Sequence, residues 1–299
     1  MAGTVAREVP ATFDFARTVR AHAFGRRDPT TRIGPADLWR ATRTPDGPGT
    51  IHVWVHASEV HSQAWGPGAE WLQAGVPALL GLDREPPVVT PHHAVVAEAL
   101  HRHPGVRIGA TRSVFHALVP AIVGQRVTVL EATRAYEGLC RAGRSPAPGP
   151  PGLLLPPSAE DLAQRPYWWF HRFGVERKRA DTLVRAARLA DRLEEAARLP
   201  MPEAYARLQH VPGIGIWTAA EVAVTALGDV DAVPVGDYHV PNLVSFALAG
   251  EPRGTDERML ELLAPYAGHR AVVLRLLGLH GPHAPRFGPR QPIMPIARW

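Results

Sequence analysis

Cysteine is almost absent from this chain of 299 residues, because Cys140 is its single cysteine. A disulfide framework, a zinc site made of four cysteines and an iron–sulfur cluster held by cysteines are therefore excluded. A chain without disulfides is suited to a reducing compartment. We accordingly expect a cytoplasmic protein.

Long apolar runs are also missing. No stretch reaches the roughly 18 uninterrupted apolar residues that a membrane span needs. The opening residues, MAGTVAREVPATFDF, contain no apolar segment of the kind that a signal peptide carries. The sequence therefore predicts a soluble protein that does not enter membranes.

Lysine is also scarce in this chain. Lys178 is the single lysine among 33 basic residues, so the other 32 are arginines. The net charge of +5 and the sequence pI of about 9.9 favour a polyanionic partner. A bias toward Arg, Ala, Gly and Pro is typical of a GC-rich bacterial genome. For any chemistry that needs a side-chain amine, the chain offers one candidate.

The first 87 residues predict an α+β domain. In GTIHVWVHA, residues 49–57, apolar Ile51, Val53 and Val55 recur at every second position, which is the period of a strand with one buried face. The opposite face would carry His52, Trp54 and His56. The stretch DREPPVVTPHH, residues 83–93, contains adjacent prolines that block regular structure, and it predicts a linker.

A larger, all-helical domain is predicted over residues 88–299, because apolar residues recur at helical spacing from Ala94 onward. Pro120 lies inside one of these stretches and is expected to kink or divide it. Residues 141–158 are rich in proline and glycine and predict a long loop. The chain ends in a proline-rich tail that has basic residues and no acidic ones. The arginines of this tail are Arg286, Arg290 and Arg298.

Two glycines flank one isoleucine in VPGIGIW, residues 211–217. The pattern predicts a turn between a helix that ends near His210 and one that begins near Trp217. Glycines permit positive φ and let a phosphate approach the backbone, where the free N–H groups of the next helix point outward. Ile214 would anchor the turn in the core. The same pattern also fits an ordinary turn between two helices.

Elsewhere in the chain, four more segments strengthen the interpretation of this turn as a DNA-binding hairpin. Together with the hairpin they resemble the helix-hairpin-helix DNA glycosylases, the HhH-GPD superfamily, and most closely the bacterial 3-methyladenine DNA glycosylase II branch. The matching segments are PGIGIWTA (212–219) followed by a Pro/Gly loop and Asp237-Tyr238, PAIVGQRVTV (120–129), FGVERKRADTLVRAARL (173–189), LLAPYAGHRAVVLRLL (262–277) and LLGLDREP (79–86).

The resemblance implies a saddle-like α+β domain over residues 1–87 and a helical glycosylase domain over residues 88–299, with a cleft between two helical subdomains. It implies a monomer associated with the nucleoid, whose partner is double-stranded DNA containing damaged bases. No cofactor and no metal are implied. The hairpin residues that would contact DNA phosphate are Pro212, Gly213, Ile214, Gly215 and Thr218.

Asp237 matches the catalytic aspartate of that family. Cleavage of a glycosidic bond builds positive charge on the sugar, and a carboxylate held against that carbon stabilises the charge and can orient water. A helix N-terminus would help to keep the aspartate ionised. Taken without the hairpin, Asp237 also fits a plain helix N-cap.

The resemblance also predicts a monofunctional enzyme. Glycosylases that cut the strand use a lysine that forms a Schiff base, two residues after the second glycine of the hairpin. Trp217 occupies that position here, and Lys178 lies well upstream in an arginine-rich helix.

Base-pocket residues follow from the same comparison. Trp217 and Tyr238 match pocket positions, where electron-rich rings stack on a flipped, cationic purine. A family tryptophan on the closing helix corresponds to Arg275, which puts the preference for methylated bases in question. Trp169, in the cluster YWWFHRF, could supply a replacement ring, although packing between helices is the simpler role for it.

Three further residues each have a functional interpretation and a purely structural one. His239 is a candidate for contact with the base or a phosphate, or a surface histidine. Gln125 is placed near the cleft by the resemblance, but could equally be a polar residue of its helix. Ile108 matches the apolar wedge that fills the gap left by a flipped base, or it anchors a loop.

The leading hypothesis is a DNA-repair glycosylase that removes alkylated purines. A DNA-binding protein that has kept the hairpin and lost the pocket remains an alternative, as does the same reaction on another lesion, such as a deaminated purine.

Overall fold

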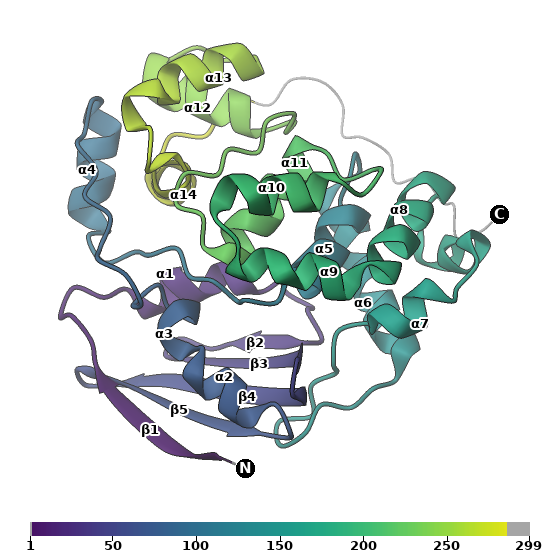
Figure 1. Ribbon diagram of the computed structural model, residues 1–299. Coiled ribbons are helices and arrows are strands. Elements are labelled where there is room, and N and C mark those ends of the chain that lie inside the picture. Colours follow the sequence, from purple (N-terminus) through teal and green to yellow (C-terminus); the bar gives the residue numbers. More distant parts are fainter. Residues whose placement is uncertain (1, 286–299) are drawn as a thin grey trace.

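A five-stranded antiparallel sheet opens the chain in this computed structural model, which describes residues 2–285 (Figure 1). The order of the strands across the sheet is β1-β5-β4-β3-β2. The strands are β1 (Ala2–Glu8), β2 (Thr31–Ile33), β3 (Asp37–Thr44), β4 (Gly47–His56) and β5 (Glu59–Trp65). The predicted arginine-rich tail, with Arg286, Arg290 and Arg298, lies outside the described residues.

The alternation predicted within residues 49–57 is confirmed in β4. Ile51 and Val53 are buried and belong to a core formed by one face of the sheet. Three short helices cover that face, because they contribute Phe15, Leu72 and Leu79 to the same core. They are α1 (Phe15–Val19), α2 (Ala69–Ala74) and α3 (Val76–Leu79), and a 3-10 turn, Arg20–His22, follows α1.

Stacked rings follow one another across the opposite face of the sheet. Trp39 of β3 pairs with His52 of β4, and their rings stack with centroids 3.8 Å apart. Trp54 of β4 pairs with His61 of β5, and their rings stack at 5.4 Å. Such cross-strand pairs fix the register of an antiparallel sheet.

Beyond the sheet, the regular structure of the described chain consists of helices and one isolated β-bridge, Pro146 to Leu154. The α-helices are α4 (Ala94–Arg102), α5 (Val114–Val123), α6 (Val129–Gly143), α7 (Ala159–Ala163), α8 (Arg177–Arg188), α9 (Ala190–Glu194), α10 (Met201–Gln209), α11 (Ile216–Val222), α12 (Val240–Ala249), α13 (Asp256–Leu263) and α14 (Arg270–His280). The 3-10 turns are Tyr167–Phe173, Glu195–Arg198 and Ala264–Tyr266, and a π-helical turn, Ala223–Leu227, continues α11. Within residues 2–285, no helix is long and apolar enough to cross a membrane.

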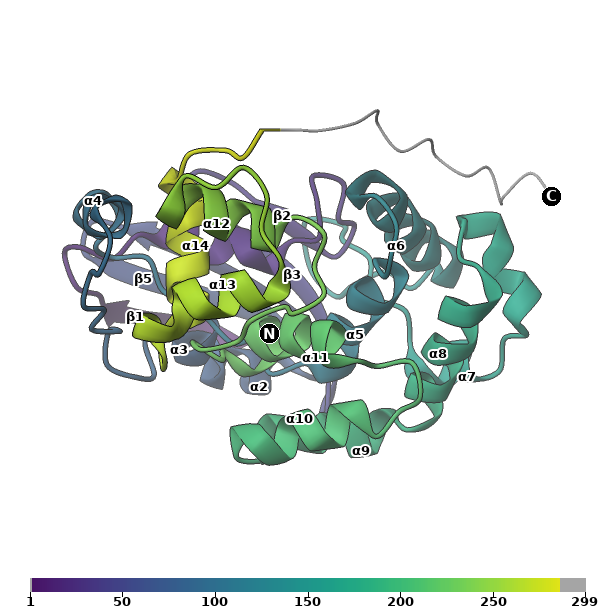
Figure 2. The same cartoon turned by 90° about the horizontal axis from the view of Figure 1, so that it is seen from above.

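The helices pack around two separate hydrophobic cores. One core lies among α5, α6 and α8, and the other among α4, α12, α13 and α14. Figures 1 and 2 show these groups on opposite sides of the molecule, with α11 between them. A small cluster that includes Ala220 of α11 and Leu276 of α14 joins the two groups. The boundaries 1–87 and 88–299 stay a prediction.

Pro120 does not divide its helix at the predicted place. It lies inside α5, which continues to Val123, and α6 begins only at Val129. The break falls in the intervening turn, where Arg126 has a positive φ of 57° and Thr128 caps α6 with a capping box. Local capping therefore decides where this helical stretch is interrupted.

A buried polar network ties the sheet to the helices. Arg40 of β3 is 4% exposed and donates a hydrogen bond to Nδ1 of His116 on α5 at 3.0 Å. Nε2 of His116 lies 2.8 Å from the hydroxyl of Tyr136 on α6. Arg40 also donates to the carbonyl of His22 at 2.8 Å. Because buried polar groups are costly unless paired, this network fixes one placement of the sheet against α5 and α6.

Candidate active site

The hairpin predicted at residues 211–217 is present, between α10, which ends at Gln209, and α11, which begins at Ile216. Gly213 has a φ of +100°, and a Cβ built there would lie 2.1 Å from Oγ1 of Thr182. Gly215 differs, because its φ is −93° and a Cβ there would meet nothing within 4 Å. The first glycine is thus required by backbone conformation and packing, whereas the second leaves open space outside the chain.

The hairpin is held in place by packing against the helical core and by hydrogen bonds. Ile214 is buried in the helical core, as predicted from the sequence. Gln125, at the end of α5, donates from Nε2 to the carbonyl of Gly213 at 2.9 Å and to Oγ1 of Thr218 at 2.8 Å. The predicted residue Gln125 therefore lies against the hairpin, and its amide nitrogen is engaged there. Pro212, Gly213 and Gly215 remain exposed.

Asp237 lies just ahead of α12, and its carboxylate accepts three hydrogen bonds. Oδ1 accepts from the backbone N–H groups of His239, at 2.7 Å, and Val240, at 2.9 Å. Oδ2 accepts from the indole Nε1 of Trp217 at 2.9 Å. The backbone donors belong to the N-terminus of a helix, where a negative charge is stabilised. The carboxylate thus has a fixed orientation, set jointly by α11 and α12.

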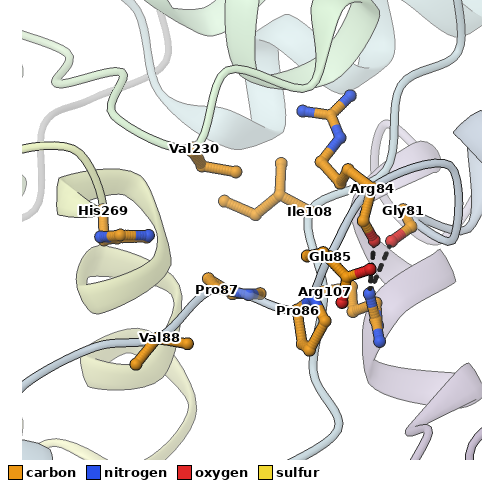
Figure 3. A pocket seen from close by; sticks show the side chains of 10 residues that line it. All are labelled: Gly81, Arg84, Glu85, Pro86, Pro87, Val88, Arg107, Ile108, Val230 and His269. Carbon is orange, nitrogen blue, oxygen red and sulfur yellow. Dashed lines mark hydrogen bonds between the residues drawn. The ribbon is translucent and has the colours of Figure 1, made fainter.

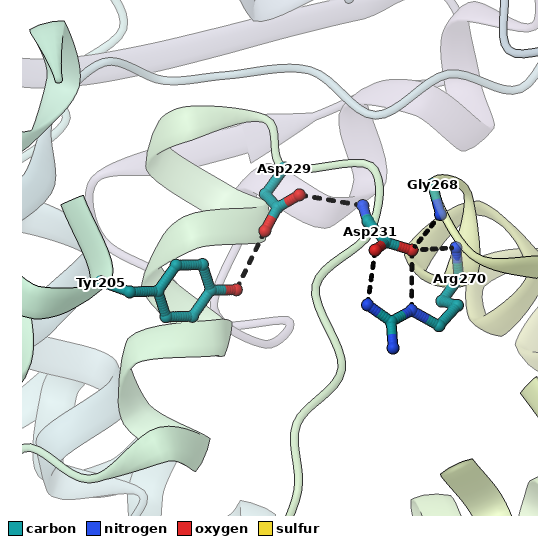
Figure 4. Close-up of polar contacts among 5 residues, drawn as sticks. All are labelled: Tyr205, Asp229, Asp231, Gly268 and Arg270. Atoms are coloured by element: carbon teal, nitrogen blue, oxygen red, sulfur yellow. Dashed lines mark hydrogen bonds and ion pairs between the residues drawn. The ribbon is translucent and has the colours of Figure 1, made fainter. Parts of the chain in front are cut away.

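The loop that leads to Asp237 is anchored at its start by two further aspartates (Figure 4). Asp229 accepts a hydrogen bond from the hydroxyl of Tyr205 at 2.9 Å. Asp231 accepts from Gly268 N at 2.8 Å and forms an ion pair with Arg270 at the start of α14. Because both anchors join the loop to neighbouring helices, the position of Asp237 depends on α10 and α14 as well as on α12.

Tyr238 and His239 follow the aspartate and point into solvent. Tyr238 is 80% exposed, and its ring meets that of His239 edge to face at 4.9 Å. His239 is exposed as well. An exposed ring beside the carboxylate is open to contact by a large ligand.

Trp169 is not brought together with Asp237. It lies in the 3-10 turn between α7 and α8, where its ring meets Phe173 at 5.0 Å and carries the guanidinium of Arg172 at 4.5 Å. It also packs against the core formed by α5, α6 and α8. Of the two roles considered for Trp169, packing between helices is the one that its surroundings favour.

Ile108 is in the interior, with 4% of its surface exposed. It packs in the cluster that joins α11 to α14 and lines a hollow together with Pro86 and Pro87 of the predicted linker (Figure 3). Arg107, its neighbour, donates to the carbonyl of Gly81 and to that of Arg84, which lies in the predicted linker. A side chain that fills a gap in DNA has to be at the surface, so the wedge assignment finds no support in this position.

Glu221 was missed by the sequence interpretation. It stands four residues after Trp217 on α11, so the two side chains share one side of the helix. Burial, and then the charge of Asp237, raise the pKa of Glu221 to about 7, while Arg275 acts in the opposite direction. An acidic residue in the apolar stretch WTAAEVAV was the available signal.

Arg275 of α14 is the partner charge. Burial lowers its pKa, and the charge of Glu221 opposes that shift. Arg275 also lines a hollow of about 300 Å³ between α14 and the 3-10 turn of residues 20–22. Among the described residues, no group of three or more His, Cys, Asp or Glu side chains is arranged to hold a metal ion.

Similar proteins were found by comparison of structures but not by comparison of sequences. No protein-family model matches the sequence, and no curated protein matches it. The 3-methyladenine DNA glycosylase from Archaeoglobus fulgidus superposes with a TM-score of 0.75 at 20% identity, over 92% of this chain and 98% of that one. MBOgg1 in complex with a low-affinity DNA ligand gives 0.74 at 16% identity, over 94% and 96%. The apo-form of the 8-oxoguanine glycosylase/lyase from Clostridium acetobutylicum gives 0.69 at 12% identity, over 94% and 97%.

These likenesses extend over nearly the full length of each pair of chains, through the N-terminal sheet and the helical region alike. The shared architecture places the glycine hairpin and Asp237 in a scaffold that several DNA glycosylases have in common. The chain has the fold of the helix-hairpin-helix DNA glycosylases.

Proposed function

We propose that this protein is a monofunctional DNA-repair N-glycosylase that flips alkylated purines of the 3-methyladenine type out of duplex DNA and releases them. The observation that carries the proposal is the Asp237 carboxylate, which is oriented by the Trp217 indole and by the amides of α12. The fold shared with 3-methyladenine and 8-oxoguanine glycosylases supports it.

Asp237 would act on the sugar. As the bond from C1′ to the purine breaks, the sugar becomes oxocarbenium-like, and a carboxylate already fixed by three donors stabilises that charge without reorganising. The same carboxylate can accept a proton from the water that attacks C1′. An alkylated purine leaves readily, because it is already a cation before the bond breaks.

The hairpin would bind the DNA backbone. Gly215 is exposed with open space outside it, and α11 has no side-chain cap for its first N–H groups. Arg185 donates to the carbonyl of Pro212 in the hairpin, and exposed Lys178 lies one turn from Thr182, which contacts Gly213. A helix N-terminus with an arginine against the preceding turn suits a phosphate group.

Strand cleavage is not expected. The hairpin position that would hold a Schiff-base lysine is occupied by Trp217, whose indole nitrogen donates to Asp237. Lys178 is exposed on α8. Borohydride added during turnover should therefore trap no protein–DNA adduct, and a trapped adduct would make the monofunctional assignment wrong.

The proposal is tested with duplexes that each contain one lesion, followed by alkaline cleavage of the abasic sites. We expect release of an alkylated purine by the wild type and none by Asp237→Asn, which removes the charge and keeps the shape. DNA binding by Asp237→Asn should be retained or slightly stronger, because one anion leaves a surface that faces a polyanion.

Equal turnover by the two proteins would remove Asp237 from the mechanism. If the wild type bound DNA but released no base from any duplex, the protein would instead be the non-catalytic binder.

A further inference from the structure

One tryptophan is exposed at the surface between α7 and α8. Trp168 belongs to the 3-10 turn Tyr167–Phe173, and 62% of its surface is exposed. Within residues 2–285, no other aromatic ring and no guanidinium lies over its ring, and its indole nitrogen donates no hydrogen bond. Aromatic side chains contribute most when their rings are removed from water. The ring of Trp168 is therefore available to a ligand.

The turn that carries Trp168 is firmly packed. Phe170 is fully buried in the core formed by α5, α6 and α8. Phe173 packs so closely against α6 that a Cβ built at Gly138 would lie 2.6 Å from its ring. Because these two rings hold the backbone of the turn, the exposure of Trp168 is a fixed feature of the surface.

Three arginines surround this turn, and their guanidinium groups lie over its rings. Those of Arg165 and Arg172 lie 5.0 and 4.5 Å from the ring centre of Trp169. That of Arg177, at the start of α8, lies 4.6 Å from the ring centre of Tyr167. In the described part of the chain, Arg165 and Arg172 form no ion pair. A guanidinium stacked on a ring keeps its N–H donors in its own plane, where they can reach an anion.

The charge around the turn suits a polyanion. Within residues 164–179, four Lys and Arg side chains are exposed, against one exposed Glu. The cations continue along α8 to Arg185, which donates to the carbonyl of Pro212 in the hairpin. From Arg177 to Arg185 the helix rises about 12 Å, which is the span of three or four nucleotides at the duplex rise of about 3.4 Å. A strand that follows α8 from the hairpin therefore reaches the turn.

We propose that this surface binds an unpaired nucleotide three or four positions away from the phosphate at the hairpin, with its base stacked on Trp168 and the adjoining phosphates on Arg165, Arg172 and Arg177. The inference rests on the DNA binding of the proposed function. It adds a preference for DNA that is single-stranded beside the lesion.

The exposed ring favours unpaired DNA over other polyanions. A duplex presents its phosphates and sugars to a protein surface, while its bases stack on one another, so it leaves the face of the indole unused. An acidic peptide can pair with the arginines but offers no flat ring. Every unpaired base has such a face, and aromatic rings beside a basic groove are the common means by which proteins bind single strands.

Three labelled DNA probes separate contact with a base from contact with phosphates. All three share one duplex segment with a stable abasic analogue at the position of the lesion. Beyond the third nucleotide, the first probe continues as duplex, the second as an overhang of thymidines, and the third as an overhang of abasic nucleotides. The overhang is placed on either side of the lesion in turn. Because the two overhangs carry the same phosphates, they differ in their bases alone.

We expect the wild type to bind the thymidine overhang about 5- to 100-fold more tightly than the abasic overhang on one of the two sides, the range that stacking of a base gives. Trp168→Ala should abolish this difference, and Trp168→Phe, which keeps a ring, should retain most of it. Arg172→Gln should weaken the binding of both overhangs alike, because a phosphate contact does not depend on the base. Val88→Ala, which shortens another exposed apolar side chain, is the control and should change neither.

Equal affinity of the wild type for the two overhangs on both sides would overturn the inference. A folded Trp168→Ala protein, checked by thermal melting, that kept the preference would do the same. So would a loss of affinity in Trp168→Ala that is equal for all three probes, because the ring would then contact the backbone. If a polyglutamate peptide bound as tightly as the thymidine overhang and depended on Trp168, the surface would be a docking site for an acidic protein instead.

The outcomes distinguish this inference from the proposed function, which is measured as base release from a full duplex. A wild type that releases bases but binds the two overhangs equally contradicts the inference and leaves the proposed function intact. A wild type that prefers the thymidine overhang but releases no base contradicts the proposed glycosylase and supports the surface at Trp168.

Discussion

At the scale of the single residue, Trp217 provides a hydrogen-bond donor as well as an aromatic ring. Its indole nitrogen holds Oδ2 of Asp237 at 2.9 Å. Trp217→Phe removes this donor and keeps an aromatic surface. A hydrogen bond to a charged group contributes about 1.5–3 kcal/mol, so we expect base release to slow roughly 10- to 150-fold, with DNA affinity unchanged.

Trp169→Phe is the matched control, because Trp169 packs in the helical core and has no contact with Asp237. Its rate of base release should equal that of the wild type. Single-turnover kinetics with DNA binding measured in parallel separate the two effects. A Trp217→Phe protein that released bases at the wild-type rate would show that the two amides of α12 suffice to hold the carboxylate.

At the scale of the element, the two glycines of the hairpin have different tasks. Gly213→Ala places a Cβ against Thr182 in a backbone with φ of +100°, so it should lower the free energy of unfolding by at least about 1–2 kcal/mol. Gly215→Ala meets open space at an ordinary φ, so its stability should equal that of the wild type. Its added methyl group lies where a phosphate is proposed to approach.

Binding measurements complete this prediction. Gly215→Ala should weaken binding to damaged and undamaged duplex alike, since a phosphate contact carries no sequence information. Urea unfolding measures the stability of both variants, and titration of labelled duplex measures affinity. Wild-type affinity in a folded Gly215→Ala protein would reduce the hairpin to a turn between two helices.

The sequence predicted those elements whose signal is local. The hairpin, the alternation in β4 and the helices α12 and α14 follow from periodicity and turn residues near each position. The break after α5 was misplaced, because the Thr128 capping box outweighs Pro120. A proline in the interior of a helix can be tolerated when the flanking packing is strong.

The candidate site was predicted less completely, for a physical reason. Asp237 and Trp217 belong to a recognisable motif, but Ile108 and Glu221 owe their environments to residues distant in the chain. Ile108 is buried in a cluster that includes residues of α4, α11 and α14. The pKa of Glu221 is raised by burial and then by the charge of Asp237, while Arg275 lowers it. No pattern within a window of sequence reports such packing, so the burial of Ile108 was not foreseen, its wedge role stays a prediction, and Glu221 was overlooked.

At the scale of the whole molecule, the contact between sheet and helices carries buried histidines. His116 of α5 lies against Arg40 of β3, and Nε2 of His22 donates a hydrogen bond to the carbonyl of Leu79 at 2.8 Å. Burial, and then the charge of Arg40, lower the pKa of His22 to about 3 and that of His116 well below its usual value. Both rings are therefore neutral in the folded protein at neutral pH.

The sign of the resulting pH dependence follows from linkage. Above a pH of about 6.5 both histidines are neutral in the folded and unfolded states, so their contribution does not change. Below that pH the two histidines become protonated in the unfolded chain but stay neutral in the folded protein. The free energy of unfolding therefore falls as the pH falls, down to about pH 3 for His22. The slope is at most about 1.4 kcal/mol per pH unit for each histidine.

Urea unfolding between pH 7.5 and pH 4 measures this loss directly. His116→Gln keeps polar atoms near Arg40 and Tyr136 but does not titrate, so the decline of its stability with falling pH should be shallower than that of the wild type. His239→Gln, at an exposed histidine, should leave the decline unchanged. The carboxylates titrate alike in all three proteins, so their contribution to the pH dependence of stability is the same in each. If His116→Gln followed the wild-type curve in parallel, the contact between sheet and helices would not be the acid-sensitive part of the molecule.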